Sequence, residues 1–141
     1  MAVLSRVSTG VRTVVATSSQ LGTVVLGETG QPGEAYRISA ADSKAYLCDA
    51  NAVDPANAEF DGYLLNGGVA DEVVAIQTGG TIYLGVATIE GMFYCVSPTP
   101  GETEEATSAL VSGNVGTVIG YGDEDGNLVI APQESAGLIP T

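Results

Sequence analysis

A pattern of glycines, β-branched residues and tyrosines occurs twice in this chain, 58 residues apart. Residues 22–39 read GTVVLGETGQPGEAYRIS, and residues 80–97 read GTIYLGVATIEGMFYCVS. Extended without a gap, residues 22–63 and 80–121 share 10 identities in 42 positions. Because neither copy could bury its apolar face alone, the repeat predicts two related halves that close one core with a pseudo-two-fold relation.

Both copies consist of short runs of β-branched residues and tyrosine, separated by glycine, proline and asparagine. Runs of this length and spacing are typical of sandwiches and barrels. The sequence therefore predicts an all-β protein, a compact β-barrel or β-sandwich, in which residues 22–141 form one domain. Residues 1–21 lie outside the repeat and contain no acidic residue, and we expect them to form an N-terminal arm or an edge strand.

Two dipeptides have the residues of tight hairpin turns. Gly79-Gly80 separates VVAIQT from TIYLG, and Asp125-Gly126 precedes NLVIAP. Glycine reaches the positive φ angles that such turns require. We therefore expect a β-hairpin at each dipeptide.

The composition is that of a folded and strongly acidic chain. Hydrophobic residues make up 45% of it and charged residues only 15%, unlike a disordered segment. The net charge is −13, and all four basic residues lie within residues 1–44, so we expect neither nucleic acid nor an anionic membrane as a partner. No run is long enough to span a membrane and residues 1–13 lack the apolar block of a secretory signal, so we expect a soluble protein used without export.

The residue types that carry most enzymatic chemistry are missing. The chain has no histidine, which removes Ser-His-Asp and Cys-His arrangements and His-containing zinc sites. Its single lysine, Lys44, does not follow a glycine-rich phosphate-binding run. Cys48 and Cys95 stand alone in apparent strands, which favours buried reduced thiols and leaves a disulfide between them open. We therefore predict no enzymatic activity, no catalytic residue and no cofactor.

One acidic stretch is a weak candidate for a metal site. Asp123, Asp125 and Asn127 stand at alternate positions, as in half a calcium-binding loop. However, the glycine comes one position early, and the glutamate that would complete the loop lies beyond Pro132. An acidic hairpin turn is favoured over a metal site.

Four of the six tyrosines are candidates for a subunit interface, because tyrosine is enriched at such interfaces. The alternative is that their rings pack at the edge of the core with the hydroxyl at its rim. The four candidates are Tyr36, Tyr63, Tyr94 and Tyr121.

Five glycine-bounded segments cover most of residues 22–122: GEAYRISAADSKAYLCDAN, FDGYLLNGG, VVAIQTGGTIYLG, GMFYCVSPTPG and GTVIGYG. In these segments the chain resembles the small capsid decoration proteins of tailed bacteriophages, also called cement or head-stabilisation proteins. The resemblance implies a β-tulip-like structural protein of the virion that is made in the host cytoplasm and binds the outer surface of the expanded capsid. It also implies a homotrimer that bridges neighbouring major capsid subunits against the pressure of the packaged DNA.

Some members of that family reach the shell with an N-terminal arm, which would place the capsid contacts of this chain within residues 1–21. The candidate contacts are Arg6, Val7, Ser8, Val11, Arg12 and Thr13. The main alternative function is a carbohydrate- or receptor-binding module of a phage tail or surface fibre. A third alternative is an enzyme or inhibitor subunit that uses paired carboxylates, such as Asp71 and Glu72.

Overall fold

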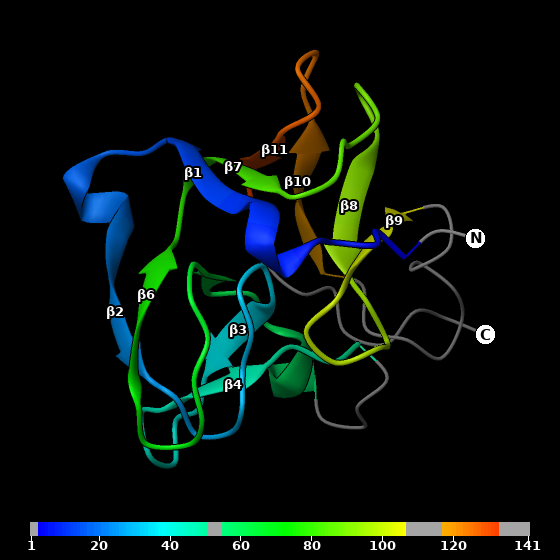
Figure 1. Cartoon of the computed structure of the whole chain (residues 1–141). Coiled ribbons are helices and arrows are strands. Elements are labelled where there is room, and N and C mark those ends of the chain that lie inside the picture. The colour runs from blue at the N-terminus through cyan, green and yellow to red at the C-terminus, as the bar shows by residue number, and fades with distance from the viewer. Residues whose placement is uncertain (1–2, 51–54, 107–116, 133–141) are drawn as a thin grey trace.

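The computed structural model describes residues 3–50, 55–106 and 117–132, and within them the chain is all-β (Figure 1). The strands form two antiparallel sheets that do not close into a barrel, so the predicted fold class is confirmed as a sandwich. The strands of the described residues are β1 (Val11–Val15), β2 (Leu21–Val25), β3 (Ala35–Ile38), β4 (Ala45–Leu47), β5 (Gly62–Leu64), β6 (Val73–Gln77), β7 (Gly80–Leu84), β8 (Phe93–Val96), β9 (Thr103–Glu105), β10 (Val118–Gly122) and β11 (Leu128–Ile130). Short 3-10 helices are η1 (Ser8–Gly10), η2 (Ser18–Gln20) and η3 (Pro55–Ala58). Among these described parts, no helix has the length and apolarity to cross a membrane.

The two sheets repeat one strand order. The five-stranded sheet runs β2-β6-β5-β3-β4, and the six-stranded sheet runs β7-β11-β10-β8-β9 after its extra edge strand β1. We call β2 to β6 the first unit and β7 to β11 the second unit, and we call two residues 58 positions apart equivalent. Equivalent residues make the same pairings: Tyr36 faces Leu47 and Gly62 in the first unit, as Tyr94 faces Glu105 and Gly120 in the second.

Of the two predicted hairpins, only the second exists. At Gly79-Gly80 the chain leaves the five-stranded sheet after β6 and enters the six-stranded sheet as β7, so it crosses between sheets instead of turning back. Gly80 has a φ of 78°, and a Cβ atom there would lie 2.1 Å from the carbonyl oxygen of Val15, so this crossing requires glycine. At Asp125-Gly126 the chain does turn back, and β10 pairs with β11.

The larger hydrophobic cluster lies between the units. The first unit contributes Ala35, Cys48, Ala50 and Tyr63, and the second contributes Ile82, Leu84, Tyr94, Val96, Ile119, Leu128 and Ile130. A smaller cluster lies within the first unit and contains Leu26, Tyr36, Ala45, Leu64, Val74 and Ile76. A pseudo-two-fold relation would bury equivalent residues equally, but Ala35 and Tyr63 are fully buried whereas Phe93 and Tyr121 are exposed. The expected pseudo-two-fold relation is therefore wrong, because the units pack with different faces.

The N-terminal segment packs against the second unit. Leu4 N donates to Thr103 O at 2.8 Å and Val7 N donates to Leu84 O at 3.0 Å, before β1 pairs with β7. In the first unit, Ala45 O, the equivalent of Thr103 O, accepts from Gly27 N at 2.8 Å. The N-terminal segment therefore pairs with β9 of the second unit, just as the residues after β2 pair with β4 of the first unit. Residues 1–21 were expected to form an N-terminal arm or an edge strand, and their described part contains the edge strand β1.

Candidate functional site

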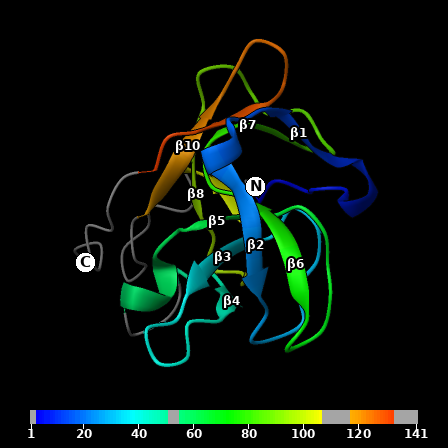
Figure 2. The same ribbon diagram turned by 90° about the vertical axis from the view of Figure 1, so that its left-hand side faces the viewer.

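Two sheet edges without a pairing strand lie on the same side of the molecule. Within the described residues, β1 pairs only with β7 and β2 pairs only with β6, so each leaves one edge open. Figure 2 views that side and shows β1 and β2 following one another along it. An open edge carries backbone N–H and C=O groups that can pair with a strand of another protein.

Exposed apolar side chains accompany these open edges. Val15 and Val73 are the most exposed, at 64% and 63%, and Val73 faces Val25 across β2 and β6. We call the set the edge surface: Val14, Val15, Leu21, Val25 and Val73. No acidic residue occurs before Glu28, although the whole chain carries a net charge of −13. Val14, Val15, Leu21 and Val25 lie within this acid-free stretch, whereas Val73 directly follows Asp71 and Glu72. Exposed apolar side chains beside open strand edges make the edge surface a candidate interaction site.

The six predicted contact residues lie in β1 or in the segment before it, and they do not all face outward. Val7 and Arg12 are exposed, and the Arg12 guanidinium lies 4.9 Å from the centre of the Tyr83 ring. Val11 and Thr13 are half-buried, and Thr13 Oγ1 donates to Gln77 Oε1 at 2.8 Å. Ser8 is half-buried as well and accepts a hydrogen bond from Arg6.

Arg6 lies in a partly buried ion cluster. Its guanidinium is 3.2 Å from Glu34 Oε2 and 3.1 Å from Glu102 Oε2, and it also donates to Pro32 O at 3.0 Å. The three charged side chains are only 10 to 19% exposed, and burial raises the pKa of Glu34 although Arg6 lowers it. The expectation that Arg6 contacts a capsid is therefore corrected: its donors join the N-terminal segment to both units.

Three of the four tyrosines proposed for an interface are interior residues. Tyr36, Tyr63 and Tyr94 are at most 2% exposed, and desolvation raises the pKa of each hydroxyl. Tyr63 and Thr103 hydrogen-bond through their hydroxyls at 2.6 Å. These three rings belong to the core and offer no surface to a partner, which corrects their assignment. Tyr121 is 39% exposed and packs edge-to-face on the exposed ring of Phe93, with 6.3 Å between ring centres.

In the acidic turn between β10 and β11, the Asp123 carboxylate binds backbone N–H groups. Asp123 Oδ1 accepts hydrogen bonds from Asp125 N and Asn127 N, both at 2.9 Å. In the described part of the chain, no three His, Cys, Asp or Glu side chains gather in a way that could hold a metal ion. The arrangement is that of an acidic hairpin turn.

Neither cysteine is activated. Cys48 and Cys95 are both free and buried. Burial raises the pKa of the Cys95 thiol to about 11 and raises that of Cys48 as well, so both stay protonated at neutral pH.

The sequence reasoning missed the edge surface beyond residue 21 and the exposed ring of Phe93. A signal for Val25 was present, since the acid-free stretch continues to Gly27, past the boundary drawn at residue 21, whereas Val73 follows two acidic residues. Comparison with protein-family models, with curated proteins and with solved structures found no match to this chain.

Proposed function

We propose that this protein is a structural virion protein that binds the outer surface of an expanded tailed-phage capsid and bridges neighbouring major capsid subunits. The observation that supports it is the edge surface, a set of exposed apolar side chains beside two open strand edges in a protein with a net charge of −13. The resemblance to capsid decoration proteins supplies the partner. The proposed function involves no enzymatic activity and no cofactor.

The proposed attachment uses the edge surface together with Val7 and Arg12. A segment of the capsid protein would pair with an open edge and cover the valines, which supplies backbone hydrogen bonds and apolar burial together. The acidic remainder of the molecule would then face outward and keep decorated particles apart. As a homotrimer the protein would attach at several identical sites at once, so a modest contact at each site gives strong overall binding.

Co-sedimentation with capsids tests this function. Purified protein is mixed with undecorated expanded heads and with unexpanded procapsids, and the bound fraction is measured against protein concentration. We expect saturable binding to expanded heads only, and loss of that binding in the double variant Val15→Asp, Leu21→Asp. The matched control is the double variant Val69→Asp, Ile89→Asp, which adds the same two charges at side chains that are 56% and 53% exposed outside the edge surface.

Two results would overturn the proposal. One is no binding of the native protein to either particle, and the other is equal binding by the native protein and the double variant. In either case, glycan binding with and without calcium becomes the next measurement.

A further inference from the structure

One asparagine of the chain is followed directly by glycine. It is Asn66, which precedes Gly67. Alanine, valine or leucine follows each of the other asparagines, which are Asn51, Asn57, Asn114 and Asn127. In an Asn-Gly pair the glycine nitrogen can attack the carboxamide carbon of the asparagine, because glycine has no Cβ to block the approach and reaches the backbone angles that ring closure requires. The pair is therefore a candidate site of covalent modification.

Asn66 and Gly67 lie at the surface, in the connection between β5 and β6. Both residues are exposed. Among the residues that the structure describes, Gly67 N and Asn66 Nδ2 have no hydrogen-bond acceptor. The attacking nitrogen and the leaving nitrogen are therefore both free to react, and no hydrogen bond of a sheet has to break first.

The oxygen of the Asn66 side chain, in contrast, is bound. Ala75 N, in β6, donates to Asn66 Oδ1 at 2.6 Å. This oxygen gains negative charge when a nucleophile adds to the carboxamide carbon. A fixed N–H donor stabilises that charged intermediate more than it stabilises the starting amide. The fold therefore places a donor at the atom where the reaction develops charge.

The fold also requires glycine at position 67. A Cβ atom there would lie 2.7 Å from Gly30 O and 3.2 Å from Gln31 Cα. Next to this contact, Gly30 and Gly68 exchange two backbone hydrogen bonds of 3.0 Å. A residue with a side chain would slow the attack on Asn66, but the close approach of the backbone excludes it.

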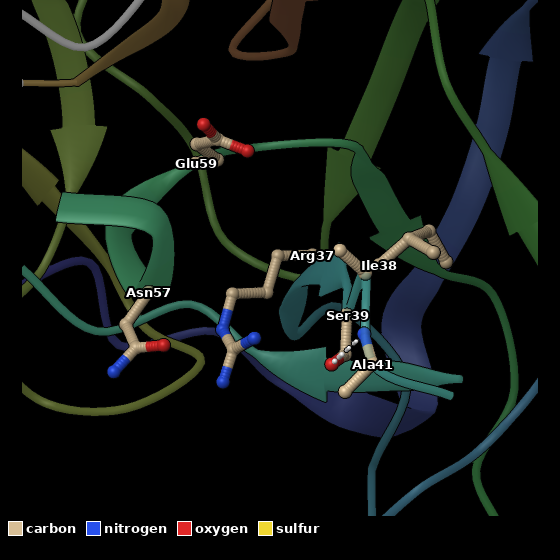
Figure 3. Close-up of a pocket in the computed structure, with 7 residues that line it drawn as sticks. Arg37, Ile38, Ser39, Ala41, Asn57 and Glu59 are labelled. Atoms are coloured by element: carbon tan, nitrogen blue, oxygen red, sulfur yellow. Dashed lines mark hydrogen bonds between the residues drawn. The ribbon is translucent and has the colours of Figure 1, made fainter. Parts of the chain in front are cut away.

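The two other asparagines in the described part of the chain are held differently. Asn127 is only 8% exposed, and the nitrogen that would attack it belongs to Leu128 in β11. Asn57 lies in η3 and lines the pocket that Figure 3 shows. The nitrogen that would attack Asn57 belongs to Ala58, which is completely buried. These two asparagines are therefore internal references for Asn66.

We propose that Asn66 is a site of spontaneous modification in the folded protein, at which the side-chain amide becomes a carboxylate. Gly67 N loses its proton and bonds to Asn66 Cγ, while the bond between Cγ and Nδ2 breaks and ammonia leaves. The product is a succinimide ring between the two residues. This step needs no enzyme, oxidant or other reactant.

Water then opens the ring in one of two ways. Cleavage of the new bond between Gly67 N and Cγ gives aspartate at position 66. Cleavage of the original peptide bond gives isoaspartate, in which the main chain runs through the side-chain carbon atoms. The inference concerns the chemistry of the chain itself and does not rest on the proposed capsid function.

The two products should differ in their effect on the fold. Aspartate adds one negative charge at an exposed position whose equivalent in the second unit, Glu124, is already acidic, and its carboxylate still accepts from Ala75 N. Isoaspartate adds one carbon atom to the main chain and so displaces Gly68 from its pairing with Gly30. We expect the aspartate form to melt like the native protein and the isoaspartate form to melt at a lower temperature.

Incubation of the full-length protein in heavy-oxygen water at mildly alkaline pH tests this inference, with circular dichroism to confirm that the protein stays folded. Mass spectrometry locates the heavy oxygen in the chain. The endoproteinase Asp-N, which cuts before aspartate but not before isoaspartate, separates the two products. We expect one heavy oxygen atom at residue 66, gained roughly tenfold or more faster than at Asn57 or Asn127 because only Asn66 precedes glycine.

Two variants serve as controls. Asn66→Gln retains the carboxamide but places it one methylene farther along the side chain, so it should abolish the modification at this position. Asn66→Asp is the reference for the aspartate product in ion exchange and in thermal melting.

An Asn66 that stays unmodified in the folded protein overturns the inference, and its conversion in urea would then show that the fold protects it. Equal rates at Asn66, Asn57 and Asn127 overturn it as well. Equal melting temperatures of the two product forms would contradict the displacement of Gly68.

Discussion

The first and second units share a strand order and equivalent residue pairings, but different neighbours cover them. The first unit closes on itself through Gly27 and Ala45, and its Tyr63 is buried against the second unit. The second unit is closed by the N-terminal segment, and its equivalent tyrosine, Tyr121, is exposed. One strand arrangement thus serves as an interior layer in one half and as a surface in the other. The difference shows that a side chain's role here is set by its position in the pair of units, not by its local sequence.

The largest expected effect separates two equivalent tyrosines. Tyr63→Ala should lower the free energy of unfolding by about 3 to 5 kcal/mol, because it empties a buried site and leaves Thr103 without its hydrogen-bond partner. Tyr121→Ala should lower it by less than about 1 kcal/mol, because the ring is exposed. Denaturant unfolding at a concentration where the protein is monomeric measures both. Equal losses would show that the two units are covered alike.

The ion cluster between the units should give the next largest effect. Arg6→Met leaves the buried Glu34 and the partly buried Glu102 without their cation and should lower the free energy of unfolding by about 2 to 3 kcal/mol. Arg12→Met removes an exposed cation above Tyr83 and should cost within about 1 kcal/mol. Thermal and denaturant unfolding compare the two variants. A smaller loss for Arg6→Met than for Arg12→Met would mean that Arg6 does not join the units.

Two equivalent glycines should respond with opposite signs. Gly80→Ala forces a positive φ on alanine and drives its Cβ into Val15 O, so it should cost about 2 kcal/mol or more. Gly22→Ala meets only the end of the Ile76 side chain, at 3.5 Å, and should be neutral or stabilising by about 0.5 kcal/mol. Melting temperatures of the two variants, compared with that of the native protein, measure the two effects. A tolerated Gly80→Ala would contradict the crossing between sheets at this position.

The smallest effect concerns pH. Burial raises the pKa of Glu34, so this group stabilises the folded state most below its ordinary pKa of 4.5, and that stabilisation is lost as the pH rises through the folded-state value. Removing Arg6 raises that pKa further. The loss caused by Arg6→Met should therefore shrink by about 1 kcal/mol on acidification from neutral pH toward 4.5. A loss that is independent of pH would show that Glu34 stays ionised in the variant.

The sequence predicted the strands and one turn better than it predicted which side chains are buried or ion-paired. The all-β class followed from short β-branched runs, and the Asp125-Gly126 turn from local glycine chemistry. Gly79-Gly80 misled because glycine allows the same positive φ whether the chain turns back or crosses to another sheet.

Burial and ion pairing escaped prediction because they depend on distant parts of the chain. Tyr63 and Tyr121 each follow a glycine, yet one is buried and the other exposed, since only the first is covered by the other unit. Arg6 could not be assigned because Glu34 and Glu102 approach it only in the folded protein.

The hydroxyl groups of the two equivalent tyrosines test the unequal cover of the two units most directly. Tyr63→Phe removes only the hydroxyl that bonds Thr103, and it should lower the free energy of unfolding by about 1 to 2 kcal/mol. Tyr121→Phe changes a side chain that is 39% exposed, and it should alter that free energy by less than about 0.5 kcal/mol. Equal losses for the two variants in denaturant unfolding would contradict the account.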